Sequence, residues 1–172
     1  MNIRNTVPED SPALLEIYRK ARAYMVKMGN PTQWGDNRPN PRLVEQDIAL
    51  RRSYVWEEDG VILGVFALIE GEEPSYRFIE QGAWPSDAPY ATLHRIASAG
   101  IRGGIGKKSL QWCMDFCRAK GLALRVDTHR DNMPMQRLLE SFGFQKCGII
   151  YVDDGTPRIA YHHHCTPEGN RG

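Results

Sequence analysis

Apolar residues recur along this chain with two different periods, and the changes between them mark its elements. Apolar positions three or four residues apart are typical of amphipathic helices, and short alternating or continuous apolar runs are typical of strands. The helical spacing predicts helices over 11–28, 41–51, 104–120 and 133–142. The strand-like runs predict strands over 3–5, 54–58, 61–69, 76–79, 93–98, 122–128, 144–151 and 158–164. This order predicts an α/β (α+β) fold, with a mixed sheet and helices on both faces.

Local signals define where some of these elements begin and end. Ser11 followed by Pro12 is an N-cap and first-turn pair that opens the first helix. Gly29-Asn30-Pro31 combines two helix-ending signals, so we expect the helix to stop there. Asp59-Gly60 between two apolar runs predicts a tight hairpin.

The glycine-rich stretch 101–108, Ile-Arg-Gly-Gly-Ile-Gly-Lys-Lys, carries the clearest chemical signal. Its glycines have no Cβ and let a ligand approach the backbone closely. The helix N-terminus predicted there offers unpaired N–H groups and the positive end of a dipole, which together bind anions. Formal positive charge comes from Arg102, Lys107 and Lys108. The stretch therefore predicts a phosphate-binding loop.

Spacing excludes two common nucleotide-binding motifs. A Walker A loop would need a glycine at 101 and a Ser or Thr at 108, where the chain has Ile101 and Lys108. A dinucleotide fingerprint would need a third glycine three residues after Gly106, where the chain has Ser109. That fingerprint also belongs near the start of a βαβ unit, whereas this loop comes more than halfway along the chain.

The same loop resembles the coenzyme A pyrophosphate loop of the GNAT N-acetyltransferase superfamily, whose pattern is Gln/Arg-x-x-Gly-x-Gly/Ala. Gly104-Ile105-Gly106 matches the glycine pair, and Ile101 stands where the family usually has Gln or Arg. That departure costs little, because the family uses this loop mainly through backbone N–H groups. Arg102 can supply the charge.

The downstream half is similar to the family's second signature. A strand over 122–128 is followed by Asn132, a helix and then Gly143-Phe144. Leu139 stands where the family's helix commonly carries a Tyr that can protonate the departing thiolate. The resemblance covers roughly residues 2–163 and supports the cofactor more strongly than the chemistry.

The resemblance implies the GNAT-like acyl-CoA N-acyltransferase fold, with a mixed, mostly antiparallel central sheet, and acetyl-CoA as cofactor. It also implies that strand 93–98 pairs its backbone with the pantetheine arm, and that a backbone N–H there polarises the thioester carbonyl. The expected cofactor-binding residues are Ile96, Ala97, Ser98, Ile101, Arg102, Gly103, Gly104, Ile105, Gly106, Lys107, Lys108 and Asn132. The structural alternatives are a solvated helix face for the two lysines and an N-cap for Asn132.

Acetyl transfer to an amine needs a base, since amines are mostly protonated at neutral pH. His94 is the first choice because imidazole titrates in the right range, and the alternative is a packed strand histidine. Asp127, Tyr90 and Glu80 are further catalytic candidates. For the acid, Tyr151 and Tyr90 are the available phenols, with solvent as the default.

Acceptor recognition should fall to two long loops, 29–41 and 80–91. Trp34 and Trp84 lie in these loops and can supply apolar walls, although loop tryptophans also serve as minor core plugs. His129, just after strand 122–128, could bind or deprotonate an amine.

Composition narrows the class of protein. With 172 residues, 41% of them hydrophobic and 25% charged, the chain suits one soluble domain over 1–165 with a frayed tail over 166–172. A net charge of +1 argues against nucleic acid as a partner. The sequence has no apolar stretch near the ~20 residues that a membrane span needs, and its first residues lack an apolar signal core.

The chain contains four cysteines, Cys113, Cys117, Cys147 and Cys165. They are not spaced as a disulfide set, so we expect free thiols and a reducing, cytoplasmic compartment. His162 and His164 share one face of a strand and could bind a metal with a cysteine, but no ligand-spacing motif accompanies them. We expect no metal, and a final strand with exposed histidines.

The leading hypothesis is an acetyl-CoA-dependent N-acetyltransferase that acts on a small amine or a peptide N-terminus. A non-catalytic acyl-CoA-binding sensor of the same fold is the alternative, because of Leu139 and the lack of an unambiguous base. A third hypothesis is transfer of a longer acyl group, or transfer to an alcohol. An exposed sheet edge near 158–164 could pair two copies into a homodimer.

Overall fold

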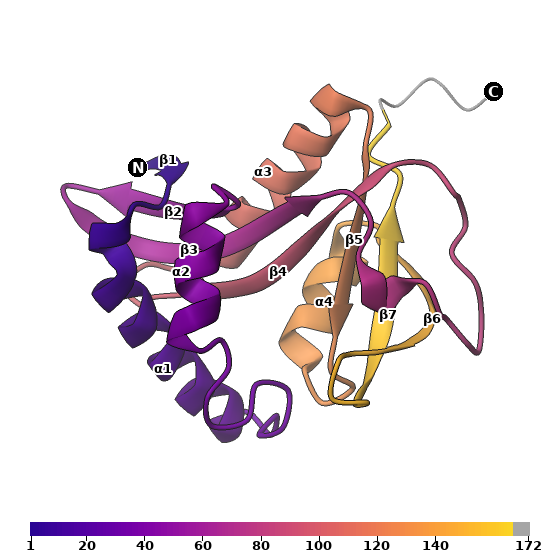
Figure 1. The fold of residues 1–172 in the computed structure, drawn as a ribbon, viewed down its shortest axis with the longest axis horizontal. Helices are drawn as coiled ribbons and strands as arrows, with labels where there is room; N and C mark the ends of the chain where they lie inside the picture. The colour runs from indigo at the N-terminus through magenta and orange to yellow at the C-terminus, as the bar shows by residue number, and fades with distance from the viewer. Residues whose placement is uncertain (167–172) are drawn as a thin grey trace. The chain divides into compact units, whose positions relative to one another are not determined.

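The computed structural model describes residues 1–166 (Figure 1). The strands are β1 (Asn2–Asn5), β2 (Ser53–Glu58), β3 (Val61–Glu70), β4 (Tyr90–Ser98), β5 (Ala123–Thr128), β6 (Gln145–Tyr151) and β7 (Pro157–His163). The helices are α1 (Ser11–Lys27), α2 (Pro41–Ala49), α3 (Ile105–Lys120) and α4 (Met133–Ser141). Two short 3-10 turns, η1 (Pro8–Asp10) and η2 (Pro74–Tyr76), complete the set.

The strands form a seven-stranded sheet in the order β1-β2-β3-β4-β5-β7-β6. The pairs β1/β2, β2/β3, β5/β7 and β6/β7 are antiparallel. The pair β4/β5 is parallel, in a register that runs from Tyr90 opposite Ala123 to Thr92 opposite Arg125. The predicted mixed, mostly antiparallel sheet is confirmed.

The chain forms two compact units. Unit 1 comprises Met1–Ile69 and His94–Leu110, and unit 2 comprises Glu70–Leu93 and the described part of Gln111–Gly172. The single domain expected over 1–165 stays a prediction. Apart from Thr166, the predicted tail lies outside the described residues.

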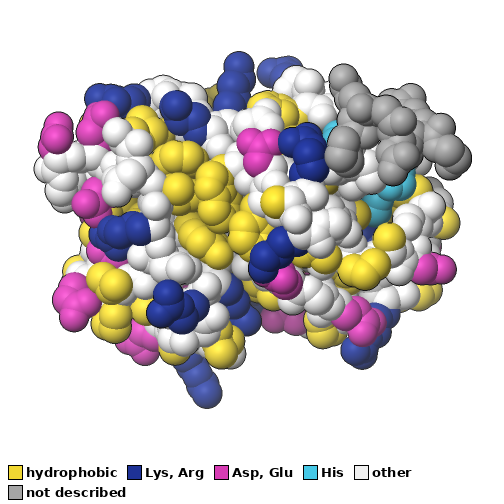
Figure 2. Space-filling model, turned by 90° about the horizontal axis from the view of Figure 1, so that it is seen from above, with side chains coloured by type: hydrophobic (Ala, Val, Ile, Leu, Met, Phe, Trp, Pro, Cys, Tyr) yellow, Lys and Arg dark blue, Asp and Glu magenta, His cyan; other side chains and the backbone are white. Residues whose placement is uncertain are grey.

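The surface carries charges of both signs. Figure 2 shows Lys and Arg side chains interspersed with Asp and Glu on the face that it displays, in keeping with the net charge of +1. Within residues 1–166, no helix has the length and apolar character needed to cross a membrane.

Unit 1 has a core between its strands and the helices α1 and α2, which contact each other (Figure 1). The helices contribute side chains at helical spacing, and the strands contribute smaller residues. The buried members are Leu14, Ile17, Tyr18, Val44, Ile48, Val55, Val65 and Ala97. In both helices the apolar residues at helical spacing therefore lie on the buried face.

The hairpin of β2 and β3 is confirmed. Its turn residues, Asp59 and Gly60, have φ angles of 51° and 78°. Two successive positive φ angles are what a type I′ turn requires, and Asp and Gly tolerate them best.

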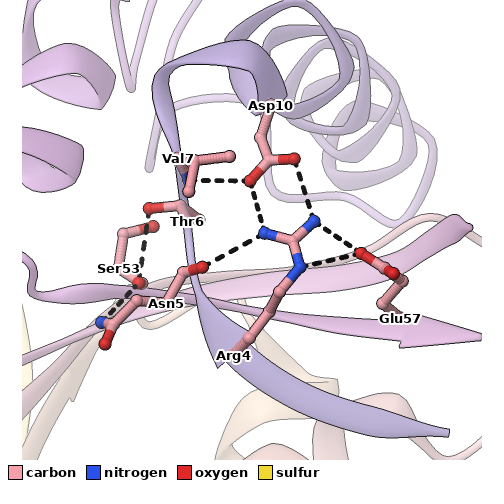
Figure 3. Close-up of polar contacts among 7 residues, drawn as sticks. All are labelled: Arg4, Asn5, Thr6, Val7, Asp10, Ser53 and Glu57. Carbon is pink, nitrogen blue, oxygen red and sulfur yellow. Dashed lines mark hydrogen bonds and ion pairs between the residues drawn. The ribbon is translucent and has the colours of Figure 1, made fainter.

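The N-cap of α1 lies one residue earlier in the chain than the sequence predicted. Asp10 is the N-cap residue, and Ser11 is already helical, so the predicted cap at Ser11 is wrong. The Asp10 side chain makes no capping bond to α1. It accepts hydrogen bonds from Arg4 and from the Val7 N–H instead, as Figure 3 shows.

Arg4 joins β1 to two other elements through one guanidinium group (Figure 3). Its Nη1 donates to Asp10 Oδ2 at 2.7 Å, and its Nη2 donates to Glu57 Oε2 at 2.5 Å. Asp10 is buried, with 8% of its surface exposed, so its carboxylate needs the hydrogen bonds from Arg4 and the Val7 N–H to compensate for its loss of water. The hydrogen bond from Arg4 holds the pKa of Asp10 below its ordinary value of 3.8.

We predict that Arg4→Met lowers the free energy of unfolding by about 1–3 kcal/mol at pH 7, because it leaves a buried carboxylate without its main donor. The stabilisation is fully present above pH 3.8 and is lost as the pH falls through the lowered pKa of Asp10. Urea unfolding at pH 7 and pH 3 should therefore show a smaller difference between variant and wild type at pH 3. The control is Arg19→Met, which removes an exposed ion pair with Glu16 and should cost less than about 0.5 kcal/mol. An equal loss in both variants would contradict the prediction.

A close contact in unit 1 fixes where α3 begins. A Cβ on Gly64 of β3 would lie 2.4 Å from Ile105 Cγ2 and 3.1 Å from the Ala97 carbonyl oxygen. Ile105 is the first residue of α3 and is 2% exposed. The absence of a side chain at position 64 therefore lets the start of α3 pack directly on β3.

In unit 2, β7 lies between β5 and β6, so the expected exposed edge near 158–164 is wrong. The outer strand is β6, and residues near Glu80 cover part of it. Glu80 and Ile149 exchange backbone hydrogen bonds of 3.0 and 2.8 Å. The approach needs Gly82, since a Cβ there would lie 1.9 Å from the Cys147 carbonyl oxygen.

The strand expected over 76–79 is also wrong. Residues 74–76 form η2, and 77–79 are irregular. In a strand the side chains of Tyr76 and Phe78 would share one face. Here Tyr76 is 2% exposed and Phe78 is 62% exposed, because the turn sends only the tyrosine into the core of unit 2.

The final strand is less exposed than the sequence predicted. His162 is 1% exposed, because Arg125 and Trp84 pack against its ring, whereas His164 follows β7 and is exposed. The prediction of exposed histidines is therefore wrong for His162. The four cysteines are free and buried, which confirms their expected free-thiol state.

Candidate functional site

The glycine-rich loop leads directly into α3, as predicted. Gly104 has a φ angle of +81°, and its carbonyl accepts the first helical hydrogen bond, from the Lys108 N–H at 3.0 Å. Gly104 therefore occupies the N-cap position, and a glycine has no side chain with which to cap. The N–H groups of the first turn have no partner within the helix. They form a donor group suited to an anion such as phosphate.

The space beside this loop is open. A Cβ built on Gly103 or Gly104 would meet no atom within 4 Å. Gly103 also lies outside the left-handed region, so neither crowding nor backbone conformation requires glycine there. The backbone at Gly103 is therefore open to close approach by a ligand.

The positive charges near the loop differ in how they are engaged. Arg102 is half-exposed and forms an ion pair with Glu58, which also pairs with the N-terminal ammonium group at 3.3 Å. Lys107 and Lys108 are exposed, and neither pairs with a carboxylate of residues 1–166. The two lysines therefore carry the uncompensated charge at this end of α3.

A contact that sequence analysis missed anchors the first turn of α3. The Ser109 hydroxyl is fully buried, donates to the Ile105 carbonyl at 2.8 Å and accepts from Trp56 Nε1 at 2.9 Å. The contact joins β2 to α3 across a sequence separation that no local pattern reveals. It holds the helix end that bears the unpaired N–H groups.

Strand β4 contains a second feature that the sequence did not reveal. Arg95 has a φ angle of 52° in the middle of the strand. A left-handed conformation costs a non-glycine residue roughly 1–2 kcal/mol and interrupts the regular pleat. The expected cofactor segment Ile96–Ser98 follows it at once, and the catalytic candidate His94, which is half-buried, precedes it.

Among the candidates in unit 2, Asp127 has the clearest polar environment. Its Oδ2 accepts from the Tyr76 hydroxyl at 2.6 Å, and the residue is half-buried on β5. Burial, followed by the charge of Asp127, raises the pKa of Tyr76 well above its ordinary value of 10.0. The phenol therefore stays protonated and acts as a fixed donor to the carboxylate.

Tyr90 and Trp84 enclose a buried arginine. The guanidinium carbon of Arg125 lies 4.0 Å from the ring centroid of Trp84 and 4.0 Å from that of Tyr90. Its Nη2 donates to the Ser86 carbonyl at 2.8 Å, and its Nε donates to His162 Nδ1 at 3.2 Å. Aromatic faces and neutral acceptors thus stabilise this cation. Both predicted residues are half-buried and pack against the core of unit 2, as the core-plug alternative expected for the tryptophan.

His162 should make the stability of the protein depend on pH. Burial, and then the charge of Arg125, lowers the pKa of His162 from 6.5 to about 4. As the pH falls, His162 therefore takes up a proton near pH 6.5 in the unfolded chain but only near pH 4 in the folded chain. The unfolded state binds more protons between these values, so the free energy of unfolding decreases as the pH falls from 6.5 to about 4. We predict that His162→Gln flattens this fall in urea unfolding measured between pH 7 and pH 4.

Gln111→Ala, at an exposed position of α3, is the control for that measurement, because it removes no titratable group and leaves the buried imidazole in place. His164 is unsuitable, since its ring lies 4.8 Å from that of His162 and its charge helps to lower the pKa of His162. The control should keep the wild-type dependence on pH. A wild-type slope retained in His162→Gln would assign the proton uptake to another group.

The other predicted residues of unit 2 have partners of their own. Glu80 accepts a short hydrogen bond from the Tyr151 hydroxyl at the surface. His129 is 6% exposed and accepts from the Asp131 N–H through Nδ1 at 3.0 Å, and burial lowers its pKa. Asn132 caps α4 by accepting from the Met135 N–H at 3.2 Å, which confirms the structural alternative for this residue.

Two further predictions concern apolar positions. Trp34 packs edge-on against Tyr18, with ring centroids 5.6 Å apart, and so belongs to the periphery of the core of unit 1. Leu139, which stands where the family pattern commonly has a tyrosine, is fully buried in α4.

Within residues 1–166, no group of three or more His, Cys, Asp or Glu residues could hold a metal ion.

The structure therefore brings together the loop residues Arg102–Lys108 at the start of α3, in the same unit as His94 and Ile96–Ser98. It brings Asp127, Tyr90 and Trp84 together around Tyr76 in unit 2. Glu80 pairs with Tyr151 instead of joining that group.

Comparison with known proteins gives consistent results. The sequence profile of the acetyltransferase (GNAT) family matches residues 13–144. A solved structure of a GNAT-family acetyltransferase from Streptococcus agalactiae 2603 is 33% identical and superposes with a TM-score of 0.84, covering 95% of this chain and 94% of that one.

Two more distant relatives extend the comparison. The peptidyl-lysine N-acetyltransferase YiaC of Escherichia coli (strain K12) is 24% identical over 152 residues, which are 88% of each chain. The structure of yncA from Salmonella typhimurium, solved with its cofactor acetyl-CoA, has a TM-score of 0.63 at 20% identity. The comparison covers 98% of this chain and 95% of yncA.

Proposed function

Because this chain belongs to the acetyltransferase (GNAT) family, we propose that it transfers an acetyl group from acetyl-CoA to a primary amine of a small molecule or a peptide. The observation that carries the proposal is the open cradle at Gly103 and Gly104, directly before an uncapped helix N-terminus. The cofactor, when bound, supplies the acyl group as a thioester. The cradle suits the anionic diphosphate of such a molecule.

Apart from Asn132, the groups proposed to hold the cofactor belong to one continuous segment of unit 1. The backbone N–H groups at the start of α3 would bind the diphosphate, and Lys107 and Lys108 would reach the outer phosphates because they are exposed and uncompensated. Arg102 would have to leave Glu58 to contribute its charge. The backbone of Ile96–Ser98 would bind the pantetheine arm. A role for Asn132 beyond its cap stays a proposal.

The proposed acceptor is an amine, and Asp127 is its proposed binding group. One carboxylate oxygen is held by Tyr76, and within residues 1–166 no other donor engages the second oxygen. A carboxylate so oriented can receive an ammonium group or a neutral amine. The name of the Escherichia coli relative, a peptidyl-lysine N-acetyltransferase, supports an amine acceptor over an alcohol.

His94 is the proposed general base, because it neighbours the proposed cofactor segment and an imidazole can accept a proton near neutral pH. Tyr90 and Glu80 are weaker candidates. The Tyr90 hydroxyl accepts from the Glu73 N–H at 2.8 Å, and the Glu80 carboxylate accepts from Tyr151 at the surface. Solvent is the proposed proton donor to the departing CoA thiolate, because Leu139 has no proton to donate at the position where the family commonly has a tyrosine.

We predict that Gly103→Ala weakens CoA binding at least tenfold while leaving the unfolding free energy within about 0.5 kcal/mol of wild type. The added methyl meets no protein atom and needs no unusual φ angle, so it should disturb only a ligand in the cradle. Calorimetric titration with CoA and urea unfolding measure the two effects. Gln111→Ala, at an exposed position of α3, is the control and should bind normally. Unchanged affinity in Gly103→Ala would refute the diphosphate assignment.

Activity is tested by a panel of amines and lysine-containing peptides with acetyl-CoA, detecting the released thiol. We expect release with at least one amine, and a fall in kcat of roughly 10²–10⁴-fold in His94→Ala if His94 is the base. His94→Ala should also flatten the rise of rate with pH. Tight CoA binding with no thiol release across the panel would favour the sensor alternative. An unchanged pH–rate profile would remove His94 as the base.

A further inference from the structure

Arg95 has a backbone conformation that its residue type disfavours, and contacts hold both its side chain and its carbonyl group. Its φ angle of 52° lies in the left-handed region, inside a strand and without the freedom of glycine. Such a residue persists where its surroundings over-determine it, and such positions cluster at functional sites. The contacts of Arg95 come from two different helices of unit 1.

The first contact fixes the side chain. Arg95 Nε donates to Asp47 Oδ2 at 2.8 Å and its Nη2 donates to Asp47 Oδ1 at 2.9 Å, which is a two-point pairing of guanidinium and carboxylate. Asp47 belongs to α2 and is 3% exposed. Its Oδ1 also accepts from Arg52 Nε at 2.7 Å. The carboxylate is therefore fully engaged and cannot move without leaving buried charges unpaired.

The second contact fixes the backbone. The Tyr18 hydroxyl donates to the Arg95 carbonyl oxygen at 2.9 Å. Tyr18 belongs to α1 and is 3% exposed, and burial raises its pKa, so the hydroxyl stays a donor at all physiological pH values. The peptide between Arg95 and Ile96 is thus anchored through its oxygen.

The backbone beyond Arg95 is anchored as well. The Ala99 N–H donates to the Leu63 carbonyl at 2.9 Å, and Ala97 is buried in the core of unit 1. A left-handed residue in a strand re-aims the groups that follow it. Tyr18 holds the Arg95 carbonyl oxygen, so the Ile96 N–H of the same trans peptide points the opposite way. The Ala97 carbonyl oxygen lies beside Gly64 of β3, which places the Ala97 backbone against β3 instead.

We propose that Asp47, Tyr18 and Arg95 form a clamp that orients the N–H group of Ile96 for the acyl group of the cofactor. The three are positioning residues, because they act through the backbone of β4. The inference rests on the proposed acetyl transfer and names how the oxyanion donor of that reaction is held in place. Backbone donors fixed before the reaction need no reorganisation when negative charge develops on the carbonyl oxygen.

The test uses two substitutions that each remove one arm of the clamp. Tyr18→Phe removes the hydroxyl and keeps the ring that packs on Trp34. Asp47→Asn keeps the shape of the side chain and removes its charge. The matched controls are Tyr24→Phe on α1 and Glu45→Gln on α2, both at exposed positions. Tyr18→Phe keeps the test decisive if Asp47→Asn does not fold.

Three measurements separate positioning from a purely structural role. We expect kcat with acetyl-CoA and the best amine to fall at least tenfold in Tyr18→Phe, while the Kd for CoA, which lacks the acyl group, changes less than threefold. Backbone chemical shifts of residue 95 in the unliganded protein should move toward extended values. The double variant should lose no more kcat than the stronger single variant, since both arms act on one residue. Both controls should match wild type.

The outcomes are distinguishable. Unchanged kcat in Tyr18→Phe, or equal losses in kcat and CoA affinity, would overturn the clamp. If wild type binds CoA but transfers nothing, the proposed function fails. The chemical shifts at residue 95 still report on the clamp in that case, and unchanged shifts in both variants would overturn it as well.

Discussion

The carboxylate of Asp47, buried between two arginines, is the constraint on which the arrangement of unit 1 depends. It pairs with Arg52 where α2 leads into β2, and with Arg95 in β4. A buried carboxylate destabilises the fold unless its partners keep their hydrogen-bonding geometry. Arg52 and Arg95 therefore cannot shift far from Asp47. The same network holds Arg95 in a left-handed conformation that costs roughly 1–2 kcal/mol. Helix packing in unit 1 is thereby coupled to the backbone of the proposed acyl-binding segment.

A second constraint, steric rather than electrostatic, sets the other half of the cofactor loop. Gly64 has no side chain, which lets Ile105 pack on β3, and Ser109 is held by Trp56. These contacts place the first turn of α3 where Gly104 leaves its N–H groups uncapped. The proposed anion site therefore depends on packing beneath the loop as much as on the glycines within it.

Much of the fold could be predicted from local pattern. The helical periodicity identified the four helices, and Asp59-Gly60 identified the hairpin, because both signals act over a few residues. Errors arose where distant residues decided the outcome. The Ser11 cap was wrong because Asp10 precedes the helix, and its carboxylate is bound by Arg4, which also donates to Glu57, 53 residues along the chain. The strand over 76–79 was wrong because Tyr76 turns into a core built by other strands.

By itself the sequence determined the four helices and all seven strands in their order, but with one strand too many. It also determined the glycine loop before a helix and, through its resemblance to a family, the class of cofactor to expect. These follow from residue types at fixed spacing, which act through local backbone preference and amphipathic periodicity. The tertiary structure alone decided that His162 is buried, that Arg125 lies between two aromatic rings, and that Asp47 and Tyr18 clamp Arg95. The residues that make these contacts are far apart in sequence. The hydrogen bond from Arg125 to His162 spans 37 residues, and the one from Tyr18 to Arg95 spans 77. Such contacts form only when the chain is folded, and no periodicity or motif encodes them.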